Sequence, residues 1–190
     1  SYDGDRLLVM IRNSLYLMDK KTLAMSLIWQ DDSVVIGKVC LTDDGHVWIY
    51  DQLAPVIYIL DDGFALVDII ELPCRGVNSV IEADGGQCFV STDNGLYLLD
   101  RSGRRLDLSD DLKKITRGEN VLFLTQNGSG SRCMGIRGKG IFVFDAYGDD
   151  IRSVWDAERL TDVQYAEAIF TDENIFLAKD RHGFSYHHLS

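Results

Sequence analysis

The chain has 190 residues, of which 46% are hydrophobic and 26% charged, with a formal net charge of −11. This composition is typical of a globular domain and argues against a disordered chain. No apolar run reaches the roughly 18 residues of a membrane-spanning helix, and the dense basic runs at 101–105 and 113–117 lie among acidic residues. We therefore expect no nucleic-acid partner and no direct membrane contact for this segment.

Short apolar segments that end in polar turns recur along the chain and predict β-strands. The segment 14–19 ends at Asp19, and equivalent segments end at Asp61, Asp100 and Asp145, at spacings of 42, 39 and 45 residues. A longer stretch with a hairpin pattern and an Asp- or Gly-rich turn precedes each of the last three. A period near 42 residues with several short strands is typical of β-propeller blades.

We therefore predict an all-β fold of four-stranded antiparallel blades, whose strands are named a to d from the centre outward. The chain would hold about 4.5 blades, three complete and two partial. Weak helix patterns at 110–114 and 156–160 predict single turns inside long connections. A small closed ring, an open arc protected by a second copy, and a fragment of a larger propeller all remain open. The predicted blades of this single arc are 1–33 (partial), 34–76, 77–118, 119–162 and 163–190 (partial).

Patterns typical of enzymes and of metal sites are missing from the sequence. It contains no G-x-S-x-G, H-E-x-x-H, P-loop or G-x-G-x-x-G motif. The acidic pairs at 43–44 and 61–62 lack the spacing of a calcium loop and are assigned to turns. We predict no catalytic residue, no metal and no cofactor. Four cysteines without a C-x-x-C spacing predict buried free thiols rather than zinc ligands: Cys40, Cys74, Cys88 and Cys133.

The predicted fold selects one face for binding, because the b–c and d–a loops of each blade emerge on the same side. These loops bring arginines and amides to an otherwise acidic chain, although for each residue taken alone a solvated loop position is the favoured interpretation. Arg binds a carboxylate through two hydrogen bonds, so the face suits a hydroxyl-rich or uronate-bearing ligand. The candidate binding residues are Arg12, Asp51, Gln52, Arg75, Asn78, Asp93, Asn94, Arg137, Lys139, Arg181 and His182.

One stretch carries a recognisable repeat: Asn78 to Tyr97 reads N-S-V-I-E-A-D-G-G-Q-C-F-V-S-T-D-N-G-L-Y. It resembles the two-component-regulator propeller repeat, whose pattern is roughly N-x-V-x-x-I-x-x-D-x-x-G-x-hydrophobic-W-I-G-T-x-x-G-L-Y. Residues 45–49 match the portion G-x-hydrophobic-W-I, but Tyr50-Asp51 stands where that family has Gly-Thr. The resemblance is good at residues 77–100 and of low fidelity over most of the remaining chain.

The resemblance implies an extracytoplasmic sensor region of a hybrid two-component system, as in Bacteroides-type bacteria. In that family the propellers are periplasmic, their ligands are often oligosaccharides, and a further β domain, a membrane helix and a histidine kinase follow. The implied partners are an oligosaccharide, the rest of the parent sensor chain and a second copy in a homodimer. The chain begins Ser1-Tyr2-Asp3 without an initiator Met, and we interpret it as a piece of such a parent. Two alternatives remain, a protein-binding propeller scaffold and a propeller polysaccharide lyase or glycosidase.

Overall fold

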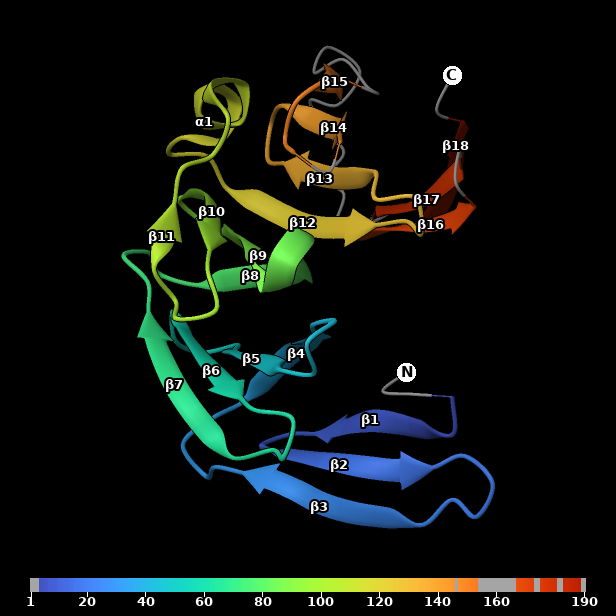
Figure 1. The fold of residues 1–190 in the computed structure, drawn as a ribbon. Helices are drawn as coiled ribbons and strands as arrows, with labels where there is room; N and C mark the ends of the chain where they lie inside the picture. Colours follow the sequence, from blue (N-terminus) through green and yellow to red (C-terminus); the bar gives the residue numbers. More distant parts are fainter. Residues whose placement is uncertain (1–3, 146, 154–166, 173–174, 181–182, 189–190) are drawn as a thin grey trace. The chain divides into compact units, whose positions relative to one another are not determined.

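The computed structural model describes residues 4–145, 147–153, 167–172, 175–180 and 183–188 (Figure 1). The chain divides into two compact units, residues 1–77 and residues 78–190. Within the described residues, each unit is built from separate antiparallel sheets in which strands adjacent in sequence pair side by side. This up-and-down order is what hairpin turns between short alternating strands produce.

The first unit contains a three-stranded sheet and a four-stranded sheet. The first sheet consists of β1 (Arg6–Ile11), β2 (Ser14–Asp19) and β3 (Met25–Gln30). The second consists of β4 (Ile36–Leu41), β5 (Val47–Asp51), β6 (Val56–Leu60) and β7 (Leu66–Glu71).

The second unit contains two four-stranded sheets and a final three-stranded sheet. A 3-10 turn at Asp84–Gly86 interrupts the first hairpin, and helix α1 (Asp110–Thr116) lies in the connection between the first two sheets. The first sheet holds β8 (Val77–Glu82), β9 (Cys88–Thr92), β10 (Gly95–Leu99) and β11 (Arg105–Leu106). The second holds β12 (Val121–Gln126), β13 (Arg132–Ile136), β14 (Gly140–Phe144) and β15 (Arg152–Ser153). The third holds β16 (Glu167–Asp172), β17 (Ile175–Asp180) and β18 (Gly183–His188).

Three four-stranded and two three-stranded meanders confirm the predicted all-β blades. The outer strands β11 and β15 have only two residues each, so those blades are narrow at their outer edge. The helical turn predicted at 110–114 is the seven-residue helix α1, which ends two residues later than predicted. The turn predicted at 156–160 lies outside the described residues.

The second strand of each complete blade is buried on both faces. All five residues of β5, of β9 and of β13 are buried. A meander buried on one face only would alternate between buried and exposed residues. Each of these strands is therefore enclosed by packed groups on both of its faces, which suits a stacked repeat.

Each unit has its own apolar core. In the first unit, residues of β2, β4, β5 and β6 form it, including Leu15, Ile49 and Leu60, and Trp29 packs against its edge. In the second unit, Leu112 of α1 joins Phe89, Met134 and Phe144 from two adjacent blades. The helix therefore belongs to the packed body of this unit and is not a detached loop.

The repeated aspartates close the turns between the third and fourth strands of the blades. Asp61 Oδ1 accepts hydrogen bonds from Gly63 N at 3.0 Å and Ala65 N at 2.8 Å. Asp100 Oδ1 accepts from the amides two and four residues later at 3.0 and 2.9 Å, and Asp145 does so at 3.0 and 2.7 Å. Asp19 Oδ1 accepts from the backbone amides two and three residues later, so its turn is a tighter version of the same pattern. The 42-residue period is therefore the period of an Asp-capped turn.

Polar contacts join the adjacent blades β8–β11 and β12–β15. Asn78 Nδ2 donates to the Val121 carbonyl at 2.8 Å, and Ser79 Oγ donates to the Leu124 carbonyl at 3.3 Å. Arg132, only 2% exposed, lies over the Phe89 ring with its Nη2 3.7 Å from an Asp84 oxygen. Burial of this guanidinium lowers the pKa of Arg132. The nearby Asp84 carboxylate acts to raise that pKa but does not outweigh the burial.

All four cysteines are free thiols. Cys88 and Cys133 are buried, and Cys40 and Cys74 are half-buried. Complete burial raises the pKa of the Cys133 thiol strongly, so it packs as a small apolar residue. In the described part of the chain, no helix is long and apolar enough to cross a membrane.

Candidate functional site

The b–c and d–a loops lie against one another, as the propeller prediction requires. In the first unit, the backbone carbonyl of Arg12 accepts from Ile36 N at 2.9 Å, and Gln52 N donates to Val35 O at 2.8 Å. In the second unit, Arg137 N donates to Asn120 O at 2.9 Å. These bonds bring the predicted binding loops together within each unit.

In the first unit, the candidate residues differ in how far they are free to bind a ligand. Arg12, Gln52 and Arg75 are exposed, and Arg12 adopts a left-handed backbone with φ of 56°. Asp51 is only 4% exposed, and its Oδ1 accepts from Leu53 N at 2.9 Å and Val35 N at 3.3 Å. The Asp51 carboxylate therefore holds its own loop against the adjacent d–a loop.

In the second unit, two of the candidate side chains are bound to neighbouring loops. Asn78 Nδ2 lies 3.1 Å from Asn120 Oδ1, in addition to its bond to the Val121 carbonyl. Lys139 Nζ lies 2.9 Å from Glu119 Oε1 and 3.1 Å from the Ile115 carbonyl. Asp93 is half-buried, whereas Asn94 and Arg137 are exposed. The two remaining candidates, Arg181 and His182, lie outside the described residues.

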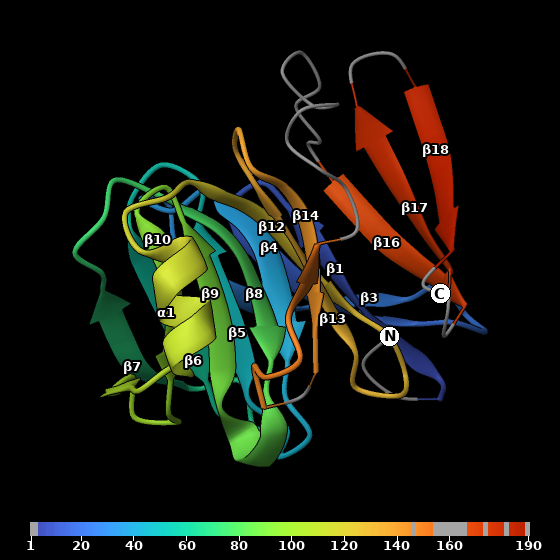
Figure 2. The same cartoon turned by 90° about the horizontal axis from the view of Figure 1, so that it is seen from above.

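A cleft of about 530 Å³ opens beside α1 in the second unit. Among the sequence candidates, only Asn94 lines it. The basic runs 101–105 and 113–117 both contribute side chains to the cleft. They come together because α1 lies beside β10 and follows β11 closely in the chain (Figure 2). The lining residues are Asn94, Gly95, Leu96, Tyr97, Arg105, Leu108, Lys113, Thr116, Arg117 and Gly118.

The cleft has an apolar base and a cationic edge. Leu96, Tyr97 and Leu108 are buried, whereas the cations Arg105, Lys113 and Arg117 are exposed. Arg105 Cζ lies 4.6 Å from the centre of the Tyr97 ring, a cation–π contact that orients the guanidinium. Lys113 Nζ lies 3.1 Å from an Asp107 oxygen and 3.8 Å from an Asp110 oxygen. Both of these carboxylates are fully exposed, so solvent screens the pairs.

The wall that α1 forms is held by a cap and by close backbone contacts. Ser109 Oγ accepts from Leu112 N at 3.3 Å at the helix start and donates to Gly148 O at 2.5 Å. Thr116 Oγ1 donates back to the Leu112 carbonyl at 2.6 Å. A Cβ atom on Gly95 would come within 3.2 Å of the Thr116 carbonyl, so the β9–β10 turn sits directly against the helix end.

The lining of the cleft is chemically mixed. It combines three cations, the Asn94 amide, the Thr116 hydroxyl and the Tyr97 phenol ring, with no carboxylate, histidine or cysteine. No nucleophile paired with a general base therefore lines the cleft. In the described residues, no group of three His, Cys, Asp or Glu side chains is placed to hold a metal ion.

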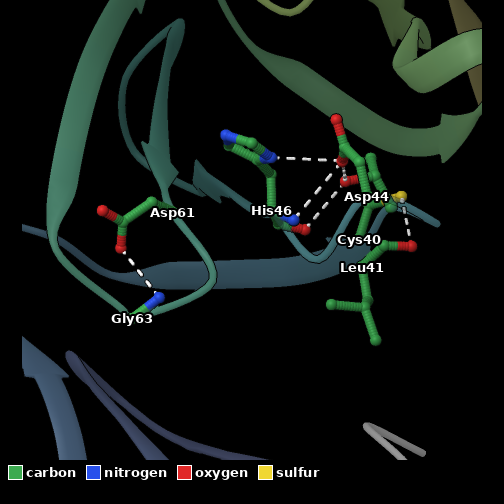
Figure 3. Close-up of polar contacts among 7 residues, drawn as sticks. Cys40, Leu41, Asp44, His46, Asp61 and Gly63 are labelled. Carbon is green, nitrogen blue, oxygen red and sulfur yellow. Dashed lines mark hydrogen bonds and ion pairs between the residues drawn. The ribbon is translucent and has the colours of Figure 1, made fainter.

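A second polar cluster, in the β4–β5 turn, stabilises that turn (Figure 3). Asp44 Oδ1 accepts from Thr42 Oγ1 at 2.5 Å and lies 3.1 Å from His46 Nδ1. Burial acts to raise the pKa of Asp44, but the hydrogen bonds from Thr42 and His46 outweigh it, and the pKa is lowered. Figure 3 also shows the Asp61 carboxylate accepting from Gly63 N in a separate turn.

The chain is similar in fold to solved structures of several kinds. The YCF48 structure with bound D1 peptide has a TM-score of 0.74 at 9% identity, covering 100% of this chain and 63% of that one. The extracellular domain assigned to the hybrid two component system BT3049 from B. thetaiotaomicron has a TM-score of 0.71 at 13% identity, covering 98% and 25%. The WD40 beta propeller domain of Doa1 has a TM-score of 0.69 at 10% identity, covering 100% and 63%.

The chain thus spans about a quarter of the BT3049 domain and less than two thirds of the other two chains. No protein-family model matches the sequence, and no curated protein matches it significantly. At these identities the similarities show the propeller-type fold alone. The expected likeness to sensor regions of Bacteroides hybrid systems is confirmed at the level of fold.

Proposed function

We propose that this chain is a ligand-binding segment of an extracytoplasmic sensor and that it binds an oligosaccharide in the cleft beside α1. The observation that carries the proposal is the cleft itself. Its volume of about 530 Å³ lies within the range of small-molecule sites. Its polar edge can bond hydroxyl groups, and its apolar base can pack against the C–H face of a sugar ring.

The cellular setting of the proposal is supported by two independent observations. The repeat at residues 77–100 resembles the two-component-regulator propeller repeat, and the fold is shared with an extracellular domain of a hybrid two component system. In this proposal the segment is periplasmic, is not itself an enzyme, and belongs to a homodimeric parent chain that carries a histidine kinase.

Signalling in such a receptor would be a shift between two arrangements of the dimer. A ligand shifts that equilibrium only by the difference between its affinities for the two arrangements. The cleft is walled by a helix that packs in the core, so a bound ligand would be coupled to the body of the second unit.

The test is a comparison of two tryptophan variants. Asn94 and Gln52 are both exposed residues of b–c loops, but only Asn94 lines the cleft. In calorimetric titrations with an oligosaccharide panel, we expect Asn94→Trp to lose at least about tenfold in affinity, and Gln52→Trp to retain it. The proposal fails if no oligosaccharide binds the wild type, or if the two variants lose binding equally. Release of new reducing ends from the panel would instead support a glycosidase or lyase.

A protein-binding scaffold is the second candidate, favoured by exposed apolar residues on an outer strand. On β7, Val67 and Ile69 are 54% and 50% exposed, and exposed apolar surface commonly marks interaction sites. The similar YCF48 structure holds a peptide. An apolar fluorescent dye that binds the wild type but not a Val67→Ser/Ile69→Ser variant would support this candidate, and equal dye binding would remove it.

A further inference from the structure

The charge of the cleft is opposite to that of the chain around it. The sequence has 19 basic and 30 acidic residues. The cleft lining, in contrast, holds Arg105, Lys113 and Arg117 and no carboxylate. Exposed charges farther away than about 8–10 Å are largely screened at physiological salt. A ligand in the cleft therefore experiences these three cations more than the distant acidic residues, and Asp107 and Asp110 beside Lys113 offset part of the charge of that one cation.

Two of the three cations are left available by their neighbours. Asp100 Oδ2 is bonded to Arg104 Nε at 3.0 Å, and Asp107 is paired with Lys113. Within the described part of the chain, neither Arg105 nor Arg117 forms an ion pair with a carboxylate. An acidic chain that leaves two arginines of one cleft unpaired presents them to solvent and to a ligand.

Arg105 is also oriented before any ligand arrives. Its guanidinium lies over the Tyr97 ring, which is 5% exposed and forms part of the cleft base. A guanidinium held in one plane loses less side-chain entropy when it forms two parallel hydrogen bonds to a carboxylate or sulfate. Neutral sugar hydroxyls cannot use this bidentate, charge-assisted geometry as well.

We infer that the cleft selects an anionic sugar residue, whose carboxylate or sulfate group is bound by Arg105 and Arg117 with support from Lys113. This inference rests on the proposed oligosaccharide function and names its ligand class. The apolar base formed by Leu96, Tyr97 and Leu108 would contact the ring of the same sugar. A uronate and a sulfated sugar present the same anionic chemistry, and the experiment separates them.

The experiment titrates the full chain with four matched probes: tetragalacturonate, its methyl ester, a sulfated carrageenan tetrasaccharide and tetraglutamate. The methyl ester keeps the sugar backbone and removes the charge. We expect tetragalacturonate or the sulfated tetrasaccharide to bind at least about tenfold more tightly than the methyl ester. The stronger of the two identifies the anionic group as a carboxylate or a sulfate.

Two variants locate the binding. Arg117→Gln is expected to lose at least about tenfold in affinity for the anionic saccharide and nothing for the methyl ester. Arg137→Gln is the matched control, since Arg137 is an exposed loop arginine of the same unit outside the cleft. A loss in Arg137→Gln without a loss in Arg117→Gln would overturn the inference and place binding at the loops.

The probes separate failure of this inference from failure of the proposed function. Equal affinity for tetragalacturonate and its methyl ester would overturn the anionic inference and leave oligosaccharide binding intact. Binding of tetraglutamate in preference to every saccharide would overturn both and assign the cleft to an acidic peptide. Lack of binding of any saccharide would likewise overturn both.

Discussion

At the scale of single residues, two glycines face aromatic rings across adjacent strands. A Cβ atom on Gly37 would lie 2.1 Å from Cε2 of Tyr50, and a Cβ atom on Gly135 would lie 2.2 Å from Cε1 of Phe123. Both rings are buried, so neither can move aside freely. Each ring occupies the space that its partner glycine leaves empty.

This contact predicts that Gly135→Ala destabilises the protein. The added methyl group must displace a packed ring, and overpacking of this kind costs about 1–3 kcal/mol in the free energy of unfolding. Gly128→Ala is the control, because a Cβ atom at Gly128 meets nothing within 4 Å. Urea unfolding measures both, and an unchanged midpoint for Gly135→Ala would contradict the prediction.

The turn aspartates make stability depend on pH. Hydrogen bonds from the Ser102 side chain, and then from the backbone amides, lower the pKa of Asp100 below its ordinary value of 3.8. A carboxylate with a lowered folded-state pKa adds stability above its unfolded pKa, and that stability is lost as pH falls through the folded pKa. The protein is therefore expected to lose stability as pH drops below about 4.

Asp100→Asn tests this dependence. Asparagine retains the Oδ1 acceptor of the turn and removes the titrating group, so the variant should lose less stability between about pH 5 and pH 2.5 than the wild type. The measurement is the urea midpoint at each pH. Identical falls in wild type and variant would show that this turn makes no contribution.

At the scale of elements, α1 connects the cleft to the core. Leu112 is fully buried, and Gly148 in the β14–β15 turn is so close that a Cβ atom there would lie 2.3 Å from Leu112 Cδ1. Ser109 links the same two elements, since it caps α1 and bonds the Gly148 carbonyl. The helix is fixed at its first turn and packed through its centre.

Ser109→Ala is expected to lower the free energy of unfolding by about 1 kcal/mol, the usual cost of losing an N-cap. It should also weaken anionic saccharide binding, because the capped helix positions Lys113 and Arg117 in the cleft. Ser26→Ala, on the exposed face of β3, serves as the control. Unchanged unfolding for Ser109→Ala would show that neither hydrogen bond stabilises the helix.

Much of the blade architecture was predictable, and the cleft was not. The strands and their order follow from local alternation and from the Asp-capped turns, which need only neighbouring residues. The cleft depends on α1 packing beside β10; the sequence predicted only a single helical turn at 110–114, and a pattern this short does not show which strand the helix packs against. Asp51 and Asn78 look like ligand-binding residues in sequence, yet their side chains bond neighbouring backbone. Sequence alone does not distinguish a polar side chain that holds a loop from one that faces a ligand.

At the scale of the whole molecule, a net charge of −11 surrounds a small cationic cleft. A short anion can enter the cleft, and because dissolved salt screens distant charges, the acidic remainder of the surface repels it only weakly. A long polyanion must extend across the acidic surface as well. The protein should therefore favour short anionic chains over polymers.

This charge distribution predicts how affinity depends on ligand length at low salt. We expect tetragalacturonate to bind more tightly per carboxylate than polygalacturonate of about 20 units, with a smaller difference near physiological salt. Calorimetric titration at two salt concentrations measures both. Affinity per carboxylate that rises with length would indicate an extended basic surface instead.

The Asp-capped turns have a consequence for how such a protein changes over evolutionary time. Each cap is completed within five consecutive residues, so a duplicated or deleted blade carries its own turn with it. The contacts specific to a junction, such as Asn78 with Val121 and Ser79 with Leu124, join one blade to the next blade along the chain. Gain or loss of a repeat therefore disturbs the contacts between neighbouring blades and leaves the turns intact, so arrays of different length can arise from the same unit by duplication.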